Sequence, residues 1–279
     1  METCSMMSAG SSRDLDRLLQ KLFADRGFDA ARYRRSYIER RIATRLRAVQ
    51  LDTYREYRTL LDRDAEEYNR LIGALTVNVT EFFRDKPVWD LFDREVVPEL
   101  LASKARRRQR LLRVWSAGCS AGEEPYSIAM LLNHAAERAD VNLTVSVHAT
   151  DIDAESLDKA RAGEYPNKEL ESVPLRFRHE CEPAADDHFR ISQRIRQLVK
   201  FRRLDLFADK PIAAVDVIFC RNVLIYFDRG QQEQIFAKFY AALNRNCYIV
   251  IGKSEKIGGD VAQHFEPVSS REKVYKRRD

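Results

Sequence analysis

The sequence predicts an α/β domain built on a mostly parallel sheet, preceded by an all-helical domain. From residue 111 onward, short β-rich runs follow one another, with helical stretches in most gaps, at 123–138, 153–162 and 229–243. Strands that alternate with helices form parallel sheets with right-handed crossovers. The preceding residues keep apolar side chains at helical spacing and contain little glycine or proline. We therefore expect two domains, 12–104 and 105–279.

The individual elements follow from these patterns in chain order. In the helical domain, leucines recur at a 3.6-residue period over 15–22, an arginine-rich helix follows, and two further helices are expected over 54–61 and 68–75. The expected strands of the α/β domain are 111–118, 143–151, 198–207, 215–222 and 247–254. The tail, 264–279, has no helix between its two apolar runs, which predicts a closing antiparallel strand or hairpin.

The segment from about 163 to 200 breaks the alternation of strands and helices. It contains Pro166, Pro174 and Pro183, and then Phe189 and Ile191 alternate with polar residues. Alternation with a period of two is typical of a strand with one buried face. We therefore expect a small antiparallel β insertion on the α/β body.

Composition excludes several classes of protein. The 279 residues are 44% hydrophobic and 33% charged, which permits a sizeable core. Charged residues interrupt every apolar stretch well before the ~18 residues of a membrane span, and the first dozen residues lack a signal-peptide pattern. The five cysteines form no CxxC pair and the five histidines are dispersed. We therefore expect a cytoplasmic protein with reduced thiols and no metal site.

The basic charge is concentrated in one predicted helix. Residues 31–50 contain seven arginines and one acid, Glu39, in a chain whose net charge is only +5. At helical spacing, Ile38, Ile42 and Leu46 share one face, and arginines line its flank. Many such helices are simply solvated and amphipathic. The use of arginine without lysine, with few counter-charges, raises the alternative of a docking surface for an acidic partner.

A glycine loop follows the first strand and precedes a helix. Gly118 and Gly122 let the backbone approach a ligand closely, and the helix offers its N-terminus. The spacing is GxxxG, and Glu123 and Glu124 stand where a dinucleotide binder would hold pyrophosphate. Carboxylates repel phosphate but suit an amino group or a cation. Asp151 ends the second strand, the usual place for an acid that binds ribose hydroxyls. A nucleoside with a cation and no phosphate is S-adenosylmethionine, whereas NAD and ATP fit worse.

Together the motifs resemble one family, the chemoreceptor glutamate methyltransferases of the CheR type. The resemblance runs from about residue 14 to the C-terminus and rests on five motifs in register: NVTEFFRD (78–85), WSAGCSAGEEPYS (115–127), ATDID (149–153), RLDLF (203–207) and IFCRNVLIYFD (218–228). It implies a Rossmann-like S-adenosylmethionine-dependent methyltransferase domain with a small antiparallel β insertion, preceded by an all-α domain.

The resemblance also implies roles for individual residues. Those expected to bind the cofactor, together with Gly118 of the glycine loop, are Asn78, Thr80, Arg84, Glu124, Asp151, Asp205, Leu206, Asn222 and Val223. Arg84 and Tyr226 are expected to orient the substrate carboxylate as the catalytic residues. The family's basic helix docks on receptors, and its best candidates here are Arg40, Arg41 and Arg45. Lys253 departs from the family pattern and is assigned no role.

The implied activity is transfer of a methyl group from S-adenosyl-L-methionine to glutamate side chains of chemoreceptors. The products would be methyl esters and S-adenosyl-L-homocysteine, formed during chemotaxis adaptation, and the partners would be the cytoplasmic domains of the receptors. One alternative is a nucleic-acid methyltransferase whose arginine helix follows phosphates, which salt-dependent binding to RNA or DNA would reveal. Another is a non-catalytic signalling protein of the same fold, which would bind cofactor without turnover.

Overall fold

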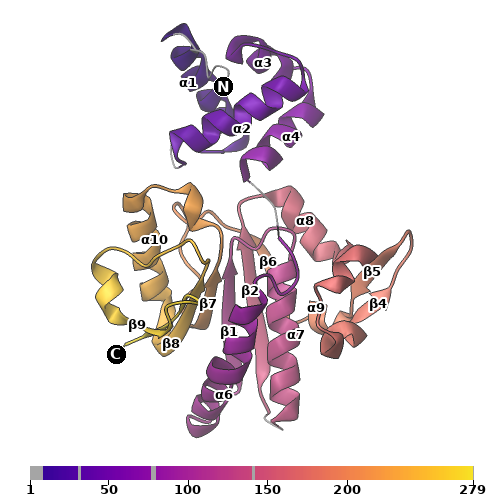
Figure 1. Ribbon diagram of the computed structural model, residues 1–279, viewed down its shortest axis with the longest axis vertical. Helices are drawn as coiled ribbons and strands as arrows, with labels where there is room; N and C mark the ends of the chain where they lie inside the picture. Colours follow the sequence, from indigo (N-terminus) through magenta and orange to yellow (C-terminus); the bar gives the residue numbers. More distant parts are fainter. Residues whose placement is uncertain (1–8, 31–32, 77–79, 140–141, 279) are drawn as a thin grey trace. The chain divides into compact units, whose positions relative to one another are not determined.

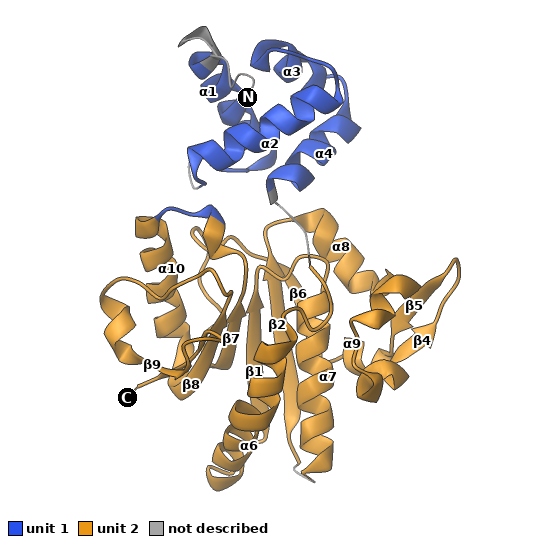
Figure 2. Ribbon diagram, viewed as in Figure 1, with its two compact units in different colours: residues 1–78, 226–228 blue, residues 79–225, 229–279 orange. Residues whose placement is uncertain are grey.

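The computed structural model describes residues 9–30, 33–76, 80–139 and 142–278, which form two compact units (Figure 2). The first unit is residues 1–78 with the short segment 226–228, and the second unit is residues 79–225 and 229–279. The division lies earlier than the boundary expected at 104/105. The physical reason is that Trp89, Phe92 and Leu100, in α5 (Lys86–Leu91), η2 (Phe92–Val96) and α6 (Val97–Arg106), are buried in the core of the second unit.

The first unit is helical, as the sequence predicts. Its helices are α1 (Ala9–Arg26), α2 (Arg35–Ala48), α3 (Tyr54–Leu61) and α4 (Ala65–Thr76). The predicted apolar face of the arginine-rich helix is buried, with Ile38, Ile42 and Leu46 each at most 4% exposed. They join leucines of α1 and tyrosines of α3 and α4 in one core. Burial of this stripe fixes which face of α2 remains available to solvent.

The second unit contains a seven-stranded sheet in the order β6-β2-β1-β7-β8-β10-β9 (Figure 1). The five parallel strands are β1 (Leu111–Ala117), β2 (Thr144–Asp151), β6 (Val199–Arg203), β7 (Val215–Cys220) and β8 (Leu243–Ile251). The tail forms an antiparallel hairpin of β9 (Phe265–Ser269) and β10 (Val274–Arg277), which pairs with β8. Both the parallel sheet and the closing hairpin were predicted from the sequence.

The strand order predicts a ligand-binding crevice at one end of the sheet. β2 and β6 lie on one side of β1, and β7 and β8 lie on the other, so the order reverses between β1 and β7. In open α/β sheets, ligands bind outside the carboxyl ends of the strands at such a switch point. The crossover helices are α7 (Glu123–Arg138), α8 (Ala154–Ala162) and α10 (Arg229–Ala242). None of the helices in the described ranges is long and apolar enough to cross a membrane.

The predicted antiparallel insertion is present between α8 and β6. Its three strands pair in the order β3-β5-β4, with bounds Glu164–Pro166, His188–Ile191 and Cys181–Pro183. Two 3-10 segments, η3 (Asn167–Glu171) and η4 (Leu175–Glu180), join β3 to β4, and α9 (Gln193–Arg196) follows β5. The next strand, β6, belongs to the main sheet because it pairs with β2.

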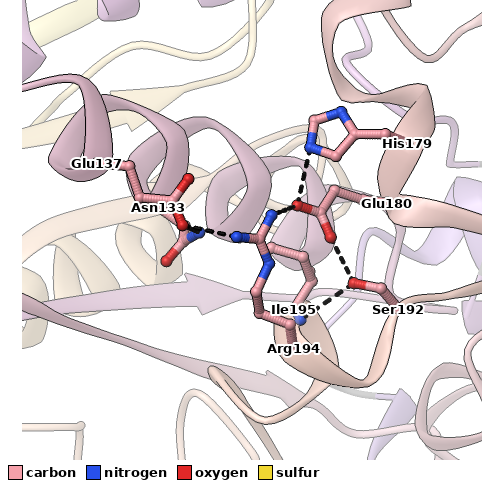
Figure 3. Close-up of polar contacts among 7 residues, drawn as sticks. All are labelled: Asn133, Glu137, His179, Glu180, Ser192, Arg194 and Ile195. Atoms are coloured by element: carbon pink, nitrogen blue, oxygen red, sulfur yellow. Dashed lines mark hydrogen bonds and ion pairs between the residues drawn. The ribbon is translucent and has the colours of Figure 1, made fainter.

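A polar network ties this insertion to α7 (Figure 3). Glu180, at the end of η4, accepts a hydrogen bond from Ser192 at 2.5 Å and pairs with the Arg194 guanidinium. Arg194 also reaches Glu137 of α7 at 2.7 Å, and His179 Nε2 lies 3.2 Å from Glu180. Because Glu180 is 4% exposed, its charge is compensated by partners instead of water. The network therefore fixes η4 and α9 against one helix of the α/β body.

Candidate active site

The loop after β1 brings two predicted cofactor residues into contact. Gly118 has a φ of 79°, and its N–H donates to the carbonyl of Thr150 at 2.8 Å. A Cβ atom built on Gly118 would lie only 2.4 Å from Cγ2 of Val223, which follows β7. Both the backbone conformation and the close approach therefore require glycine. The predicted glycine loop and the Asn222–Val223 pair thus lie side by side at the switch point.

Asp151, at the end of β2, is held rigidly. One carboxylate oxygen accepts the N–H of Ser120 at 2.8 Å, and the other accepts the N–H of Asp153 at 3.0 Å. Burial raises the pKa of Asp151, and these two backbone donors oppose the rise. Each carboxylate oxygen can accept more than one hydrogen bond, so both keep capacity for a ligand hydroxyl. The Leu204 N–H donates to the Asp151 carbonyl at 2.9 Å, which places the segment of Asp205 next to it.

Glu124 belongs to a chain of charges at the strand ends. Its carboxylate accepts a hydrogen bond from Ser116 at 2.7 Å and lies 3.8 Å from the guanidinium of Arg221. Burial raises the pKa of Glu124, and Arg221 opposes that rise. The Arg221 side chain is only 3% exposed and also pairs with Asp85 at 2.7 Å. Lys253 reaches the other oxygen of Asp85 at 3.1 Å. Four segments of the second unit thus place alternating charges in one row.

Of the four residues in this row, only Glu124 was predicted from the sequence as a site residue. Lys253 was assigned no role. Asp85 and Arg221 lie within two of the family motifs, and this was the only sequence signal that could have identified them. Their partnership joins residues 136 positions apart in the chain, so no local pattern predicts it. The row also explains how a buried arginine is tolerated, because two carboxylates compensate its charge.

Asn222 stands in a turn that a buried carboxylate supports. Its φ is 61°, and its side-chain oxygen is buried without a hydrogen-bond partner among the described residues. Glu255, 4% exposed, accepts the N–H of Gly252 at 2.5 Å and that of Leu224 at 2.7 Å. Glu255 was also missed, because an acid in a loop after a strand carries no distinctive pattern. The Glu255 carboxylate therefore fixes the backbone of the turn, while the Asn222 side-chain oxygen remains available to accept a hydrogen bond from a ligand.

The first motif contributes a strained loop. Asn78 lies outside the described residues. The Thr80 side chain hydrogen-bonds to Glu123, whose pKa burial raises to about 7. Arg84 is half-buried, and its carbonyl accepts the indole N–H of Trp89 at 2.9 Å. Its positive charge favours the ionised form of Glu124, and the next residue, Asp85, is itself a member of the charge row.

Tyr226, the second predicted catalytic residue, belongs to the first unit. Its ring centroid lies 4.8 Å from that of Tyr37, and its carbonyl accepts the N–H of Arg34 at 3.0 Å. The neighbouring Phe227 packs against Tyr33 with ring centroids 5.2 Å apart. The segment 226–228 is therefore held by aromatic contacts with the helical unit.

The three predicted docking arginines of α2 differ in their surroundings. Arg40 is exposed. Arg41 is half-buried, with its guanidinium 5.5 Å from the ring centre of Tyr37. Arg45 pairs with Glu67 of α4, donating from Nε at 3.0 Å and from a second nitrogen. Arg45 thus has a partner within the helical unit, and Arg40 is the most available of the three.

The donors and acceptors of this crevice fit S-adenosylmethionine. Glu124 and Asp151 present carboxylates where a phosphate binder would present amides or cations, which suits an amino group and ribose hydroxyls. The unpartnered oxygen of Asn222 offers a further acceptor. The absence of a Cβ at Gly118 lets the Val223 side chain pack directly against this loop.

Comparison with known sequences decides the family. The profile described as "CheR methyltransferase, SAM binding domain" matches residues 78–274, and "CheR methyltransferase, all-alpha domain" matches residues 13–76. The chain belongs to the CheR methyltransferase family. This CheR-type chain is 38% identical over 251 residues to "Chemotaxis protein methyltransferase 2" of Pseudomonas aeruginosa, covering 87% of this chain and 86% of that protein. It is 35% identical over 247 residues to the "Chemotaxis protein methyltransferase" of Escherichia coli, covering 86% and 82%.

A Listeria monocytogenes "Chemotaxis protein methyltransferase" is 36% identical over 233 residues, covering 84% of this chain and 86% of that protein. These matches confirm the predicted family, the all-α domain followed by a methyltransferase domain, and S-adenosylmethionine as cofactor. The CheR-type chain is therefore an S-adenosylmethionine-dependent methyltransferase of chemotaxis.

Proposed function

We propose that this methyltransferase esterifies glutamate side chains in the cytoplasmic domains of chemoreceptors, acting in the cytoplasm. The observation that carries the proposal is the pair of carboxylates, Glu124 and Asp151, at the strand ends of the unit that also carries the cation of Arg84. The thiols of Cys119 and Cys220 are buried, and burial raises the pKa of each well above its ordinary value. A glutamate carboxylate, with a pKa of about 4.3, is already ionised at neutral pH and needs no base.

Each cofactor-binding residue has a proposed role. Glu124 holds the amino group, and Asp151 holds the ribose hydroxyls. Asp205 and Leu206 lie by the adenine, while Gly118, Asn222 and Val223 close around the nucleoside, with Asn78, Thr80 and Arg84 completing the contacts. Bound S-adenosyl-L-methionine supplies a methyl group activated by its sulfonium, and S-adenosyl-L-homocysteine remains afterwards.

Arg84 and Tyr226 are proposed to orient the acceptor carboxylate. Alignment of the reacting groups supplies several kcal/mol of barrier reduction, which is the main contribution available where no proton is moved. Arg84 must bind the carboxylate weakly, because a strong ground-state ion pair would lower its nucleophilicity. We expect Arg84→Ala to lose most methyl transfer while it keeps part of its cofactor affinity, measured by calorimetry. Wild-type turnover in this variant would remove Arg84 from the mechanism.

The receptor surface is proposed to dock on α2. Methylated receptor segments expose glutamates, so they present an acidic surface that complements arginine. Arg40 and Arg41 are the strongest candidates, because Arg45 is already paired with Glu67. Binding by these residues should weaken with salt, since exposed charges are screened.

The decisive experiment uses the purified chain, methyl-labelled S-adenosylmethionine and a chemoreceptor cytoplasmic fragment. Label that enters the receptor and is released by mild alkali as methanol would establish a carboxyl methyl ester. Label that survives alkali would mean methylation of nitrogen or carbon, and the glutamate assignment would fall. Cofactor binding with no label in any receptor would instead support a non-catalytic role.

A further inference from the structure

The backbone around Arg84 is strained. Arg84 stands between two non-glycine residues in the left-handed region, Phe83 with a φ of 50° and Asp85 with a φ of 61°. Such conformations persist only where surrounding contacts fix them, and they cluster at functional sites. The Phe83 N–H donates to the hydroxyl of Ser127 at 3.0 Å, and Asp85 pairs with Arg221. These polar contacts hold the loop from the α/β body.

The β insertion holds the same loop from its other side. The ring of Phe83 stacks on that of Phe177 in η4, with centroids 5.2 Å apart and planes 7° apart. The preceding Phe82 meets Tyr165 of β3 edge-on at 4.9 Å and Phe189 of β5 at 5.8 Å. Tyr165, Phe177 and Phe189 all belong to the insertion, and each is at most 3% exposed.

Phe177 is itself fixed on several sides. His134 of α7 meets its ring edge-on at 5.6 Å, and the Arg176 guanidinium lies 4.6 Å from its ring centre. Three residues further along η4, Glu180 is bound by Ser192 and Arg194 (Figure 3). The network therefore holds η4, and η4 holds the ring on which Phe83 stacks.

We infer that the insertion positions Arg84, with Phe177 as the positioning residue. The inference rests on the proposed function of Arg84 and adds a role for a segment that lies outside the crevice. Stacking of Phe177 on Phe83 favours the strained backbone, which in turn aims the Arg84 side chain. Positional errors of about 1 Å in an aligned site cost up to roughly 100-fold in rate.

The test is Phe177→Leu against a matched control, Phe236→Leu. Phe236 of α10 is also fully buried in the second unit, so both variants lose a buried ring of the same size, and its ring packs against Phe239 of the same helix. We expect Phe177→Leu to lower kcat for receptor methylation about 10- to 100-fold beyond the control, with the KM for receptor within about threefold. Cofactor affinity, measured by calorimetry, should fall less than kcat.

Hydrogen exchange gives a readout that does not depend on turnover. Amide exchange at Phe83 should accelerate in Phe177→Leu and stay at the wild-type rate in Phe236→Leu. The double variant Phe83→Leu with Phe177→Leu should be no slower in kcat than the slower single variant, because both remove one contact. Equal kcat and equal Phe83 exchange in Phe177→Leu and Phe236→Leu would overturn the inference. A wild-type chain that transfers no methyl, while Phe83 exchange still responds, would instead overturn the proposed function.

Discussion

The pairing of Arg45 with Glu67 predicts that this arginine stabilises the helical unit. The Glu67 side chain is 1% exposed, and its carboxylate is bound by Arg45 and by the hydroxyl of Tyr57 at 2.6 Å. The perturbation is Arg45→Met, which keeps the apolar stem of the side chain and removes the guanidinium. The buried Glu67 carboxylate then keeps the neutral Tyr57 hydroxyl as a donor but loses the guanidinium that compensated its charge.

The magnitude follows from the burial of the charge that is left behind. Removing one partner of a buried ion pair costs about 3–5 kcal/mol. Arg45 itself is 21% exposed, so water can replace part of its contact, and we expect the lower end, about 3 kcal/mol. Since about 1.4 kcal/mol corresponds to a factor of ten, opening of the helical unit should become about 100-fold more frequent.

Hydrogen exchange resolved by peptide is the appropriate assay. Amides of α2 and α4 should lose about 100-fold of their protection in Arg45→Met. The control is Arg40→Met on the same helix, where an exposed side chain should change stability by no more than about 0.5 kcal/mol. Both tryptophans, Trp89 and Trp115, lie in the second unit, so their fluorescence independently reports that this unit remains folded.

Two results would refute this reasoning. Protection of α2 and α4 equal to wild type in Arg45→Met would mean that the pair contributes no net stability. The double variant Arg45→Met with Glu67→Met should recover much of the loss, because replacing both ions by apolar groups removes the uncompensated charge. A double variant as unstable as the single one would place the effect in packing instead of charge.

Two further predictions concern the second unit. Burial raises the pKa of Glu123 from 4.5 to about 7. Protonated Glu123 therefore contributes to the free energy of unfolding in full below pH 4.5, and this contribution should be lost as the pH rises to about 7. Glu123→Gln should remove roughly 3 kcal/mol of this pH dependence in urea unfolding followed by tryptophan fluorescence, and an unchanged slope would contradict it. Gly118→Ala should cost about 2–5 kcal/mol and weaken cofactor binding at least tenfold by calorimetry, because its Cβ meets Val223 at 2.4 Å. The control is Gly27→Ala: Gly27 has a φ of 69°, but a Cβ built there meets no atom within 4 Å, so this variant should lose only the stability that the backbone conformation costs. Equal losses of stability in the two variants would exclude the Cβ–Val223 clash as a cause.

Much of the crevice was predictable because its signals are local. Asp151 is the last residue of its strand, and Gly118 and Asn222 follow within two residues of the ends of theirs; parallel strands bring their carboxyl ends to one edge. The structure brings Gly118 and Val223 into contact as that topology requires. The roles of these residues toward the cofactor remain predictions that the proposed experiments test.

The sequence by itself determined the fold class, the family and the segments that border the crevice. Strand and helix periods are set by neighbouring residues, and the motifs keep their spacing within single loops. Only the tertiary structure decided which charges are paired. It joins Asp85 to Arg221 across 136 positions and Arg45 to Glu67 across 22, and it stacks Phe83 on Phe177 of the insertion. Each of these partnerships has at least one member buried by other elements, and burial is a property of packing that no single segment carries.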